Sequence, residues 1–343
     1  MSYQRGWQAV NLEMPESVAR TEYCSHPKLV KSITGVDPRE DGGAWRLFYD
    51  AVGYDLIWWC NDGPRWTGRQ TNMGHAEFQE GGTDYDDNVH CPFASPEEVL
   101  SFDPADEYGV PEIKERAEYF EESYRNGQAA YPNQIFPGGY YKTIFSACIQ
   151  AFGWDMFLSA AALDYEKFNG VLEGFFRISM ANYEAWARTS APVFICHDDI
   201  VWTSGPVFHP DWYRKYVFPR YKKLWRVLKD AGKIVLFCSD GDFTMFIDDI
   251  AEAGADGFIF EPMTDLATVV SKYGQTKVII GNVDTRALTF GTKEDIKAEV
   301  QRCMELGKPC PGFFIAVGNH IPHNVPLENA LYYLELVDQM SKR

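Results

Sequence analysis

The sequence predicts an α/β protein in which parallel strands and helices alternate around a single closed (β/α)8 barrel. Apolar runs that end in polar residues alternate with helical stretches from about residue 130 onward. No glycine-rich phosphate turn follows the first predicted strand, which disfavours the alternative, an open doubly wound sheet. With 343 residues and a 45% apolar composition, the chain can bury the large core that one barrel needs.

Five strands are predicted in the second half of the chain, each followed by a helical pattern. The strands are expected at residues 193–199, 234–240, 257–262, 277–284 and 313–320. The helices are expected at residues 209–232, 243–254, 265–274, 292–307 and 326–340, with Thr292 and Asp295 forming a cap. Strands joined through helices pair in parallel, and the connections are right-handed.

Three further strands are expected upstream, at residues 54–62, 133–139 and 155–162, which completes a ring of eight. The first 130 residues are otherwise irregular, with a helix start at Ser95 and a charged helix at about 111–126. We therefore expect one domain over 1–343. In it, 1–130 forms an N-terminal helical and loop extension that covers one end, and 131–343 forms most of the barrel.

Composition limits the classes of partner and compartment. The formal charge of −17 argues against nucleic acid and anionic membranes, and against a highly anionic substrate unless a local basic pocket exists. No apolar run approaches a membrane span, and the first residues lack a signal-peptide core. Eight scattered cysteines without a CxxC pair indicate reduced thiols rather than disulfides or a zinc ribbon. A cytoplasmic protein is expected, and a homodimer is one arrangement that the sequence allows.

Functional groups in a barrel lie at the C-terminal ends of its strands. The polar residues at the predicted strand ends are Asp62, His197, Asp198, Asp199, Cys238, Asp240, Asp242, Glu261, Asn282, Asp284, Asn319 and His320. Any one of them is more often a helix cap than a catalyst. Five consecutive strands that all end in such residues nevertheless indicate a site at one end of the barrel.

The stretch Cys238-Ser-Asp240 carries the metal hypothesis. Residues i and i+2 of a strand point the same way, so the thiol and the carboxylate converge while Ser239 points elsewhere. With Glu261 and His320 from neighbouring strands, Cys238 and Asp240 make a set that suits zinc. The alternative is a polar turn without a metal. In that case Asp199, Asp240 or His320 would act as a general acid.

A substrate pocket lined by aromatic side chains is a further expectation, because aromatic residues make up 15% of the chain. Trp59, Tyr140 and Tyr141 lie beside predicted turns, although packing in the core explains them equally well. The expected substrate-binding residues are Asp62, Trp59, Tyr140, Tyr141, His197, Asn282, Asp284 and Asn319.

From residue 191 onward the chain resembles the uroporphyrinogen decarboxylase-like superfamily, including its corrinoid- and coenzyme M-linked methyltransferases. The residues that carry the resemblance are DDIVWTSGPVFHPDWYRKYVFPRYKKL (198–224), VLFCSDGD (235–242), GADGFIFEP (254–262), IIGNVDTRAL (279–288) and GNHIPHNVPLEN (318–329). The resemblance covers about 150 residues. It implies a distorted (β/α)8 barrel.

In the zinc methyltransferase branch, a strand ends in His-x-Cys-Gly, and another cysteine follows the last strand. Here Cys238 stands at the histidine position, Asp240 at the cysteine position, and Gly241 matches. The later cysteine falls at or beside Asn319-His320, and Glu261 matches a carboxylate that can approach the metal. Each ligand position has therefore changed its residue type. The arginine motif of the decarboxylase branch is absent from the N-terminal region.

The resemblance implies removal of a methyl group from a small substrate, such as an aromatic O-methyl compound. The methyl group would pass to a corrinoid carried by a corrinoid-binding partner protein, with a metal (zinc) or a general acid activating the leaving group. One alternative is a metal-free decarboxylase or lyase that acts on a small carboxylate substrate through Asp199 and His320. Another is a non-catalytic barrel that carries a corrinoid or tetrapyrrole.

Overall fold

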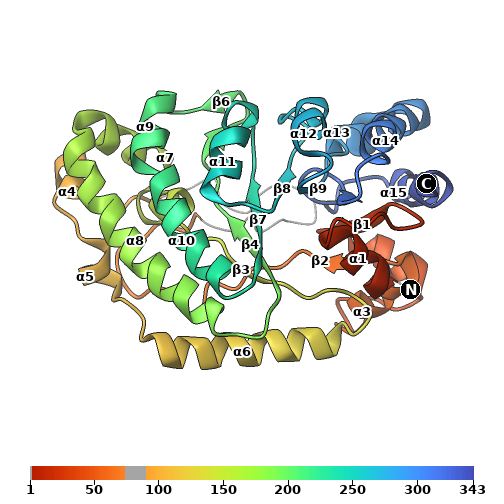
Figure 1. Ribbon diagram of the computed structural model, residues 1–343, viewed down its shortest axis with the longest axis horizontal. Helices are drawn as coiled ribbons and strands as arrows, with labels where there is room; N and C mark the ends of the chain where they lie inside the picture. The colour runs from red at the N-terminus through yellow and green to blue at the C-terminus, as the bar shows by residue number, and fades with distance from the viewer. Residues whose placement is uncertain (1, 74–89) are drawn as a thin grey trace.

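The computed structural model describes residues 2–73 and 90–343, and within these residues eight strands form one parallel sheet curled around a central axis (Figure 1). The strands are β1 (Ala19–Glu22), β2 (Leu56–Ile57), β3 (Gly138–Tyr140), β4 (Val193–His197), β7 (Ile234–Ser239), β8 (Gly257–Phe260), β9 (Val278–Ile280) and β10 (Phe313–Ile315). Their order around the sheet is β2-β1-β10-β9-β8-β7-β4-β3. A parallel bridge between Leu56 and Ile135 joins the two edges, so the strands follow one another in chain order around a closed ring.

Helices surround the ring on its outer side (Figure 1). In the first half of the chain they are α2 (Pro27–Thr34), α3 (Ala44–Val52), α4 (Pro96–Leu100), α5 (Pro104–Tyr108), α6 (Ile113–Ala130), α7 (Phe145–Leu163) and α8 (Tyr165–Ala187). The first helix, α1 (Ser2–Val10), is the exception, because it packs against the inside of the ring. In the second half they are α9 (Pro210–Tyr216), α10 (Phe218–Asp230), η1 (Thr244–Phe246), α11 (Ile247–Ala253), α12 (Leu266–Tyr273), α13 (Thr285–Phe290), α14 (Lys293–Gly307) and α15 (Leu327–Met340). A small antiparallel hairpin, β5 (Val201–Trp202) and β6 (Gly205–Pro206), follows β4.

Two apolar clusters hold the barrel together. The smaller one fills the ring with alternate residues of its strands, among them Ile195, Leu236 and Phe314. Ala9 and Val10 of α1 belong to this inner cluster, so the first helix packs against the interior of the ring. The larger cluster lies between the strands and the surrounding helices. The two-residue alternation of each strand thus divides its side chains between two cores.

The barrel class predicted from the sequence is confirmed. The five predicted strands of the second half are all present, with their regular pairing confined to shorter spans. Upstream, β2 lies within the predicted segment 54–62, and β3 overlaps the end of the predicted segment 133–139. The capping box of Thr292 and Asp295 is also present. The predicted helix over 209–232 is divided at Val217, and α10 begins at the next residue, with Pro219 in its first turn.

The predicted strand at 155–162 is wrong, because this segment lies in α7. Its residues DMFLSAAA are apolar on several sides and include good helix formers, so a buried helix gives the same apolar run as a strand. The eighth strand is instead β1, whose sequence ARTE has no apolar run. Burial there is possible because Arg20 pairs with Asp338 at 2.5 Å and the hydroxyl of Thr21 donates to the carbonyl of Leu56.

Residues 1–130 include two strands of the ring, β1 and β2, in addition to α1 to α6. This region therefore contributes to the wall of the barrel as well as to the expected extension. None of the helices in the described part of the chain is long and apolar enough to cross a membrane. All eight cysteines lie among the described residues, and each is a free thiol.

We propose that 1–343 is one folding unit, because removal of β1 and β2 would open the ring. Limited proteolysis should therefore release no stable fragment that ends near residue 130, and denaturant should unfold the chain in one transition. A protected fragment of about 130 residues, or two separated transitions, would contradict the single domain.

Glu22, the last residue of β1, is a buried carboxyl group with 1% of its surface exposed. The backbone N–H of Val317 donates to both its side-chain oxygens at 3.1 and 3.0 Å, and the hydroxyl of Tyr333 also donates to it. Burial outweighs these hydrogen bonds and raises the pKa of Glu22 to about 8. The carboxyl group of the folded protein is therefore protonated at neutral pH.

The free energy of unfolding should fall as the pH rises, because the folded pKa of Glu22 lies above the value of about 4.3 for an unfolded chain. Its contribution is complete below that lower value and is lost progressively up to about pH 8, by at most about 1.4 kcal/mol per pH unit. Urea unfolding at several pH values should show this loss in the wild type, with a much flatter profile for Glu22→Gln. Parallel profiles of the two proteins would show that Glu22 is ionised in the folded state.

Candidate functional site

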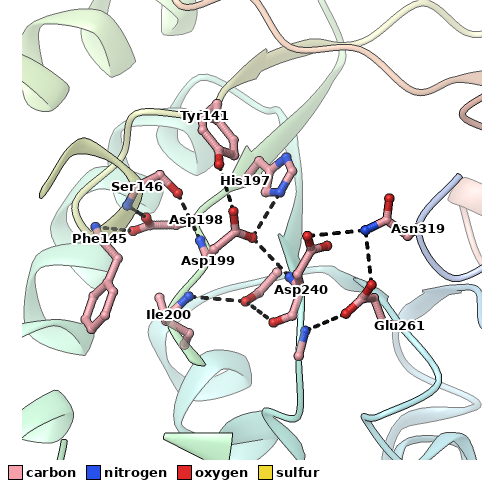
Figure 2. Close-up of polar contacts among 12 residues, drawn as sticks. Tyr141, Phe145, Ser146, His197, Asp198, Asp199, Ile200, Asp240, Glu261 and Asn319 are labelled. Atoms are coloured by element: carbon pink, nitrogen blue, oxygen red, sulfur yellow. Dashed lines mark hydrogen bonds and ion pairs between the residues drawn. The ribbon is translucent and has the colours of Figure 1, made fainter. Parts of the chain in front are cut away.

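Two strands place a histidine and two aspartates together at the C-terminal end of the ring (Figure 2). β4 and β7 pair with His197 opposite Cys238, so the residues two positions further on, Asp199 and Asp240, also lie opposite each other. The side chains of His197, Asp199 and Asp240 each offer a ligand atom, and these three atoms all lie within 4.8 Å of one another. We call these three residues the acidic cluster.

Asp199 is held from several sides (Figure 2). Its Oδ1 lies 3.2 Å from Nε2 of His197 and accepts the backbone N–H of Asp240 at 3.1 Å. Its Oδ2 accepts the hydroxyl of Tyr141 at 2.9 Å. The ring of Tyr141 also stands edge-on to that of His197, with centroids 4.5 Å apart. These contacts fix the position and the charge of the Asp199 carboxylate.

Asp240 is linked to a second carboxylate through Asn319 (Figure 2). The amide of Asn319 donates to Asp240 Oδ2 at 3.3 Å and to Glu261 Oε1 at 3.0 Å. The backbone N–H of Gly241 donates to the other oxygen of Glu261 at 2.8 Å. Nδ1 of His320 lies 2.7 Å from the amide oxygen of Asn319, so His320 orients the amide that joins the two carboxylates.

Charge within the acidic cluster is unevenly shared. Burial raises the pKa of Asp240 well above its ordinary value, and the charges of Asp199 and Glu261 raise it further. Burial also acts on Asp199, but the neighbouring His197 keeps the pKa of Asp199 below its ordinary value. Burial disfavours the imidazolium of His197, yet Cys238 and Asp199 raise its pKa well above the ordinary range. These directions favour negative charge on Asp199 and a proton on Asp240.

The acidic cluster has a donor set that fits a metal ion, because imidazole nitrogen and carboxylate oxygen are both zinc ligands. A cation would relieve the repulsion that raises the pKa of Asp240. Of the residues predicted to bind zinc, only Asp240 belongs to this set of close ligand atoms; Cys238, Glu261 and His320 do not. Burial raises the pKa of Cys238 to about 11, so its thiol stays protonated at neutral pH.

His320, predicted as a catalytic acid, is buried with 6% of its surface exposed. Burial and the neighbouring His323 lower the pKa of His320 to about 4. A neutral imidazole is a much weaker acid than an imidazolium, so His320 is poorly suited to donate a proton at pH 7. The contact with Asn319 instead gives His320 a positioning role in the site.

Asp198 lies between His197 and Asp199, just after the end of β4. Its side chain faces away from the acidic cluster. Its carboxylate accepts the backbone N–H groups of Ile144, Phe145 and Ser146 at 3.0, 3.1 and 2.6 Å, at the start of α7. The hydroxyl of Tyr221 donates to it at 2.5 Å. Asp198 therefore anchors α7 to β4, and the hydroxyl of Ser146 in turn accepts the N–H of Asp199 at 3.0 Å.

The predicted substrate-binding residues divide into two groups. Tyr141, His197 and Asn319 lie at the acidic cluster, and Asp62 adjoins it by accepting the backbone N–H of Tyr141 at 2.7 Å. The others are elsewhere: Trp59 packs against Phe136, Tyr140 accepts a hydrogen bond from Asn182, Asn282 donates to the carbonyl of Thr264, and Asp284 pairs with Arg286.

Sequence reasoning missed two neighbours of the site. The first is Cys60, whose thiol lies beside His197. Burial raises the pKa of Cys60, and the contact with His197 only partly offsets this. Cys60 stands two residues before Asp62, so strand alternation could have found it. The other is Ser146, whose role depends on a turn after β3 that leaves no local pattern. Ser239 also differs from its expected passive role, since its hydroxyl accepts from the N–H of Ile200 and donates to the carbonyl of Asp240.

Comparison with known proteins shows the family to which the chain belongs. Residues 88–340 match the family model described as uroporphyrinogen decarboxylase (URO-D). Proteins named uroporphyrinogen decarboxylase from Pelobacter propionicus and Geobacter sulfurreducens are 31% and 32% identical over 140 and 141 residues. The matched stretch covers 41% of this chain and 41% of each relative, so the chain spans about two fifths of the length of these curated relatives.

A similar solved structure is a methyltransferase from Methanosarcina mazei, with a TM-score of 0.64 and 17% sequence identity. The alignment covers 98% of this chain and 98% of that chain. At this identity the likeness supports the fold.

The two neighbouring aspartates should differ in their effects on stability. Asp198→Asn leaves one of the N–H donors at the start of α7 poorly matched, so we expect the free energy of unfolding to fall by about 1–3 kcal/mol. Asp199→Asn removes a charge from a crowded cluster and should cost less. Urea unfolding measures both, with the exposed Asp106→Asn as the control. A larger loss for Asp199→Asn would mean that the cluster, and not the anchor of α7, holds this end of the barrel.

Proposed function

Because the chain belongs to the uroporphyrinogen decarboxylase family, we propose that it is a methyltransferase of that family's corrinoid-linked type. Its substrate would be a small methyl donor, such as an aromatic O-methyl compound. The methyl group would pass to the cobalt of a corrinoid held by a separate binding protein, in the cytoplasm. The observation that carries the proposal is the arrangement of His197, Asp199 and Asp240, whose ligand atoms lie within 4.8 Å of one another at the end of the barrel.

Methyl ethers react slowly because an alkoxide is a poor leaving group, so the leaving oxygen must be protonated or coordinated. In the proposed step the C–O bond breaks and its electron pair stays on oxygen. The methyl carbon forms its new bond with the electron pair of the reduced cobalt of the partner protein. A proton from Asp240 neutralises the oxygen, so the products are a hydroxyl compound and the methylated corrinoid.

The chain's own residues would prepare this proton transfer. Burial, together with repulsion from Asp199 and Glu261, raises the pKa of Asp240 and so favours its protonated form. Tyr141 and His197 hold Asp199 in place, and Asn319 holds both Asp240 and Glu261. After the reaction, a positively charged His197 would stabilise the new negative charge on Asp240, because opposite charges attract.

Zinc is the alternative source of activation. His197, Asp199 and Asp240 would hold it, and a bound zinc ion would act as a Lewis acid on the leaving oxygen. Two carboxylates and one imidazole leave a fourth position for substrate, as in catalytic zinc sites. The likeness to the methyltransferase from Methanosarcina mazei supports a barrel that suits this chemistry.

A second candidate function is metal-free decarboxylation or a lyase reaction on a small carboxylate. The names of the matched relatives, uroporphyrinogen decarboxylase, favour it. In that case Asp199 or Asp240 would exchange a proton with the carbon that loses carbon dioxide. This reaction needs no corrinoid protein, which distinguishes it from methyl transfer.

Methyl transfer from a panel of small methoxylated aromatics to reduced cobalamin should be detectable by the absorbance change of the corrinoid. Asp240→Asn should lower the rate by about 10²–10⁴-fold, the usual contribution of a general acid. Asp106→Asn, an exposed change outside the site, should not alter it.

Zinc titration by calorimetry separates the two modes of activation. The acidic cluster binds zinc if the wild type gives a binding signal and His197→Ala abolishes it. Carbon dioxide release without methyl transfer would establish the second candidate.

A further inference from the structure

A pocket of about 160 Å³ lies between the segment that follows β2, the helices α5 and α6, and the helix α8. Its polar lining includes Arg65, Arg116 and Asn182. Its wall also includes the side chains of Trp66, Tyr108, Val110, Pro111 and Ile178. One liquid water occupies roughly 30 Å³, so the pocket has room for a small organic molecule.

Arg116 is the central cation of this pocket. It is half-buried on α6, and its guanidinium donates to Oδ1 of the buried Asn182 at 2.7 Å. The backbone of Gly63 packs so closely on the guanidinium that a side chain at this position would clash with it. Among the residues that the structure describes, no carboxylate forms an ion pair with Arg116. Most other arginines, such as Arg69 with Glu98 and Arg220 with Glu173, do have one.

Two further cations lie near Arg116. Arg65 lines the same pocket and has no ion-pair partner in the described part of the chain. Lys142 is 7% exposed, and its ammonium lies 4.6 Å from the centre of the Trp66 ring. Burial lowers the pKa of Lys142; the charge of Asp62 opposes this, while Arg65 and Arg116 lower the pKa further. Arg65, Arg116 and Lys142 thus lie near one another in a chain whose formal charge is −17.

We propose that this pocket binds the carboxylate group of a small organic anion. A guanidinium offers parallel N–H donors that match a carboxylate, and a half-buried one gains most when an anion replaces water. Asn182 fixes the guanidinium before the ligand arrives, which reduces the ordering that binding requires. The side chains of Trp66 and Tyr108 in the lining offer apolar surface to the organic body of the anion.

The pocket lies across β3 from the acidic cluster. Gly138 approaches Trp186 and Tyr140 reaches Asn182 on the outer side of the strand, while Tyr141 reaches Asp199 on the inner side. The anion is therefore a second ligand and not a part of the proposed methyl donor. Asp62 joins the two places, since it accepts the N–H of Tyr141 and influences Lys142.

Calorimetric titration of the full chain with benzoate, and with its neutral analogue benzamide, tests the proposal. Benzoate should bind and benzamide should not. Arg116→Gln should weaken benzoate binding at least about tenfold, because a charged hydrogen bond is lost. Arg116→Lys should retain part of the affinity. Arg125→Gln, an exposed change on the same helix, is the matched control and should bind as the wild type does. These titrations do not depend on the proposed methyl transfer.

Other results would overturn the proposal. Absence of benzoate binding to the wild type, equal binding by Arg116→Gln, or equal binding of benzamide would each exclude a carboxylate site. Displacement of benzoate by inorganic phosphate would show an oxyanion site without preference for an organic body. Circular dichroism checks that each variant is folded. If Arg116→Gln is not, Arg65→Gln gives the same test at an exposed position, with an expected weakening of benzoate binding.

Discussion

The register of β4 against β7 is the constraint on which the site depends. Pairing His197 with Cys238 brings Asp199 and Asp240 opposite each other one step later. Two carboxylates at such a distance and depth cannot both be ionised without a large cost, so a proton or a cation must be shared between them. Asp198, which precedes Asp199 in the sequence, holds α7 and thereby keeps the strand end from relaxing away from this arrangement. The chemistry of the site thus follows from a backbone alignment.

The sequence predicts much of this fold because most barrel strands are apolar runs that end in polar residues. It fails at β1, where burial of Arg20, Thr21 and Glu22 depends on partners far along the chain, such as Asp338 and Tyr333. It fails again at 155–162, where a fully buried helix lacks the alternation that separates helix from strand.

The candidate site could be predicted in part. Alternation along each strand selected Asp199 and Asp240, and the expected aromatic pocket selected Tyr141; the structure brings the three together. Alternation could not choose among Cys238, Glu261 and His320 as partners of Asp240, because that choice depends on distances across the ring. Asn282 and Asp284 illustrate the same limit: both follow a strand, but local hydrogen bonds turn their side chains to the backbone and to Arg286.

Charge is segregated across β3 in a way that net charge does not reveal. The inner side of this strand end meets acidic groups, and the outer side meets Arg116 and Arg65. Successive side chains of 140–142 alternate between these environments, so a single short segment carries Tyr141 to Asp199 and Lys142 to Trp66. Movement of this segment would change the contact of Tyr141 with Asp199 and that of Lys142 with Trp66 together. An anion held by Arg116 would reduce the repulsion among Arg65, Arg116 and Lys142. The carboxylate of Asp62 fixes the backbone of Tyr141, and Tyr141 in turn holds Asp199, so this one segment links the outer pocket to the acidic cluster.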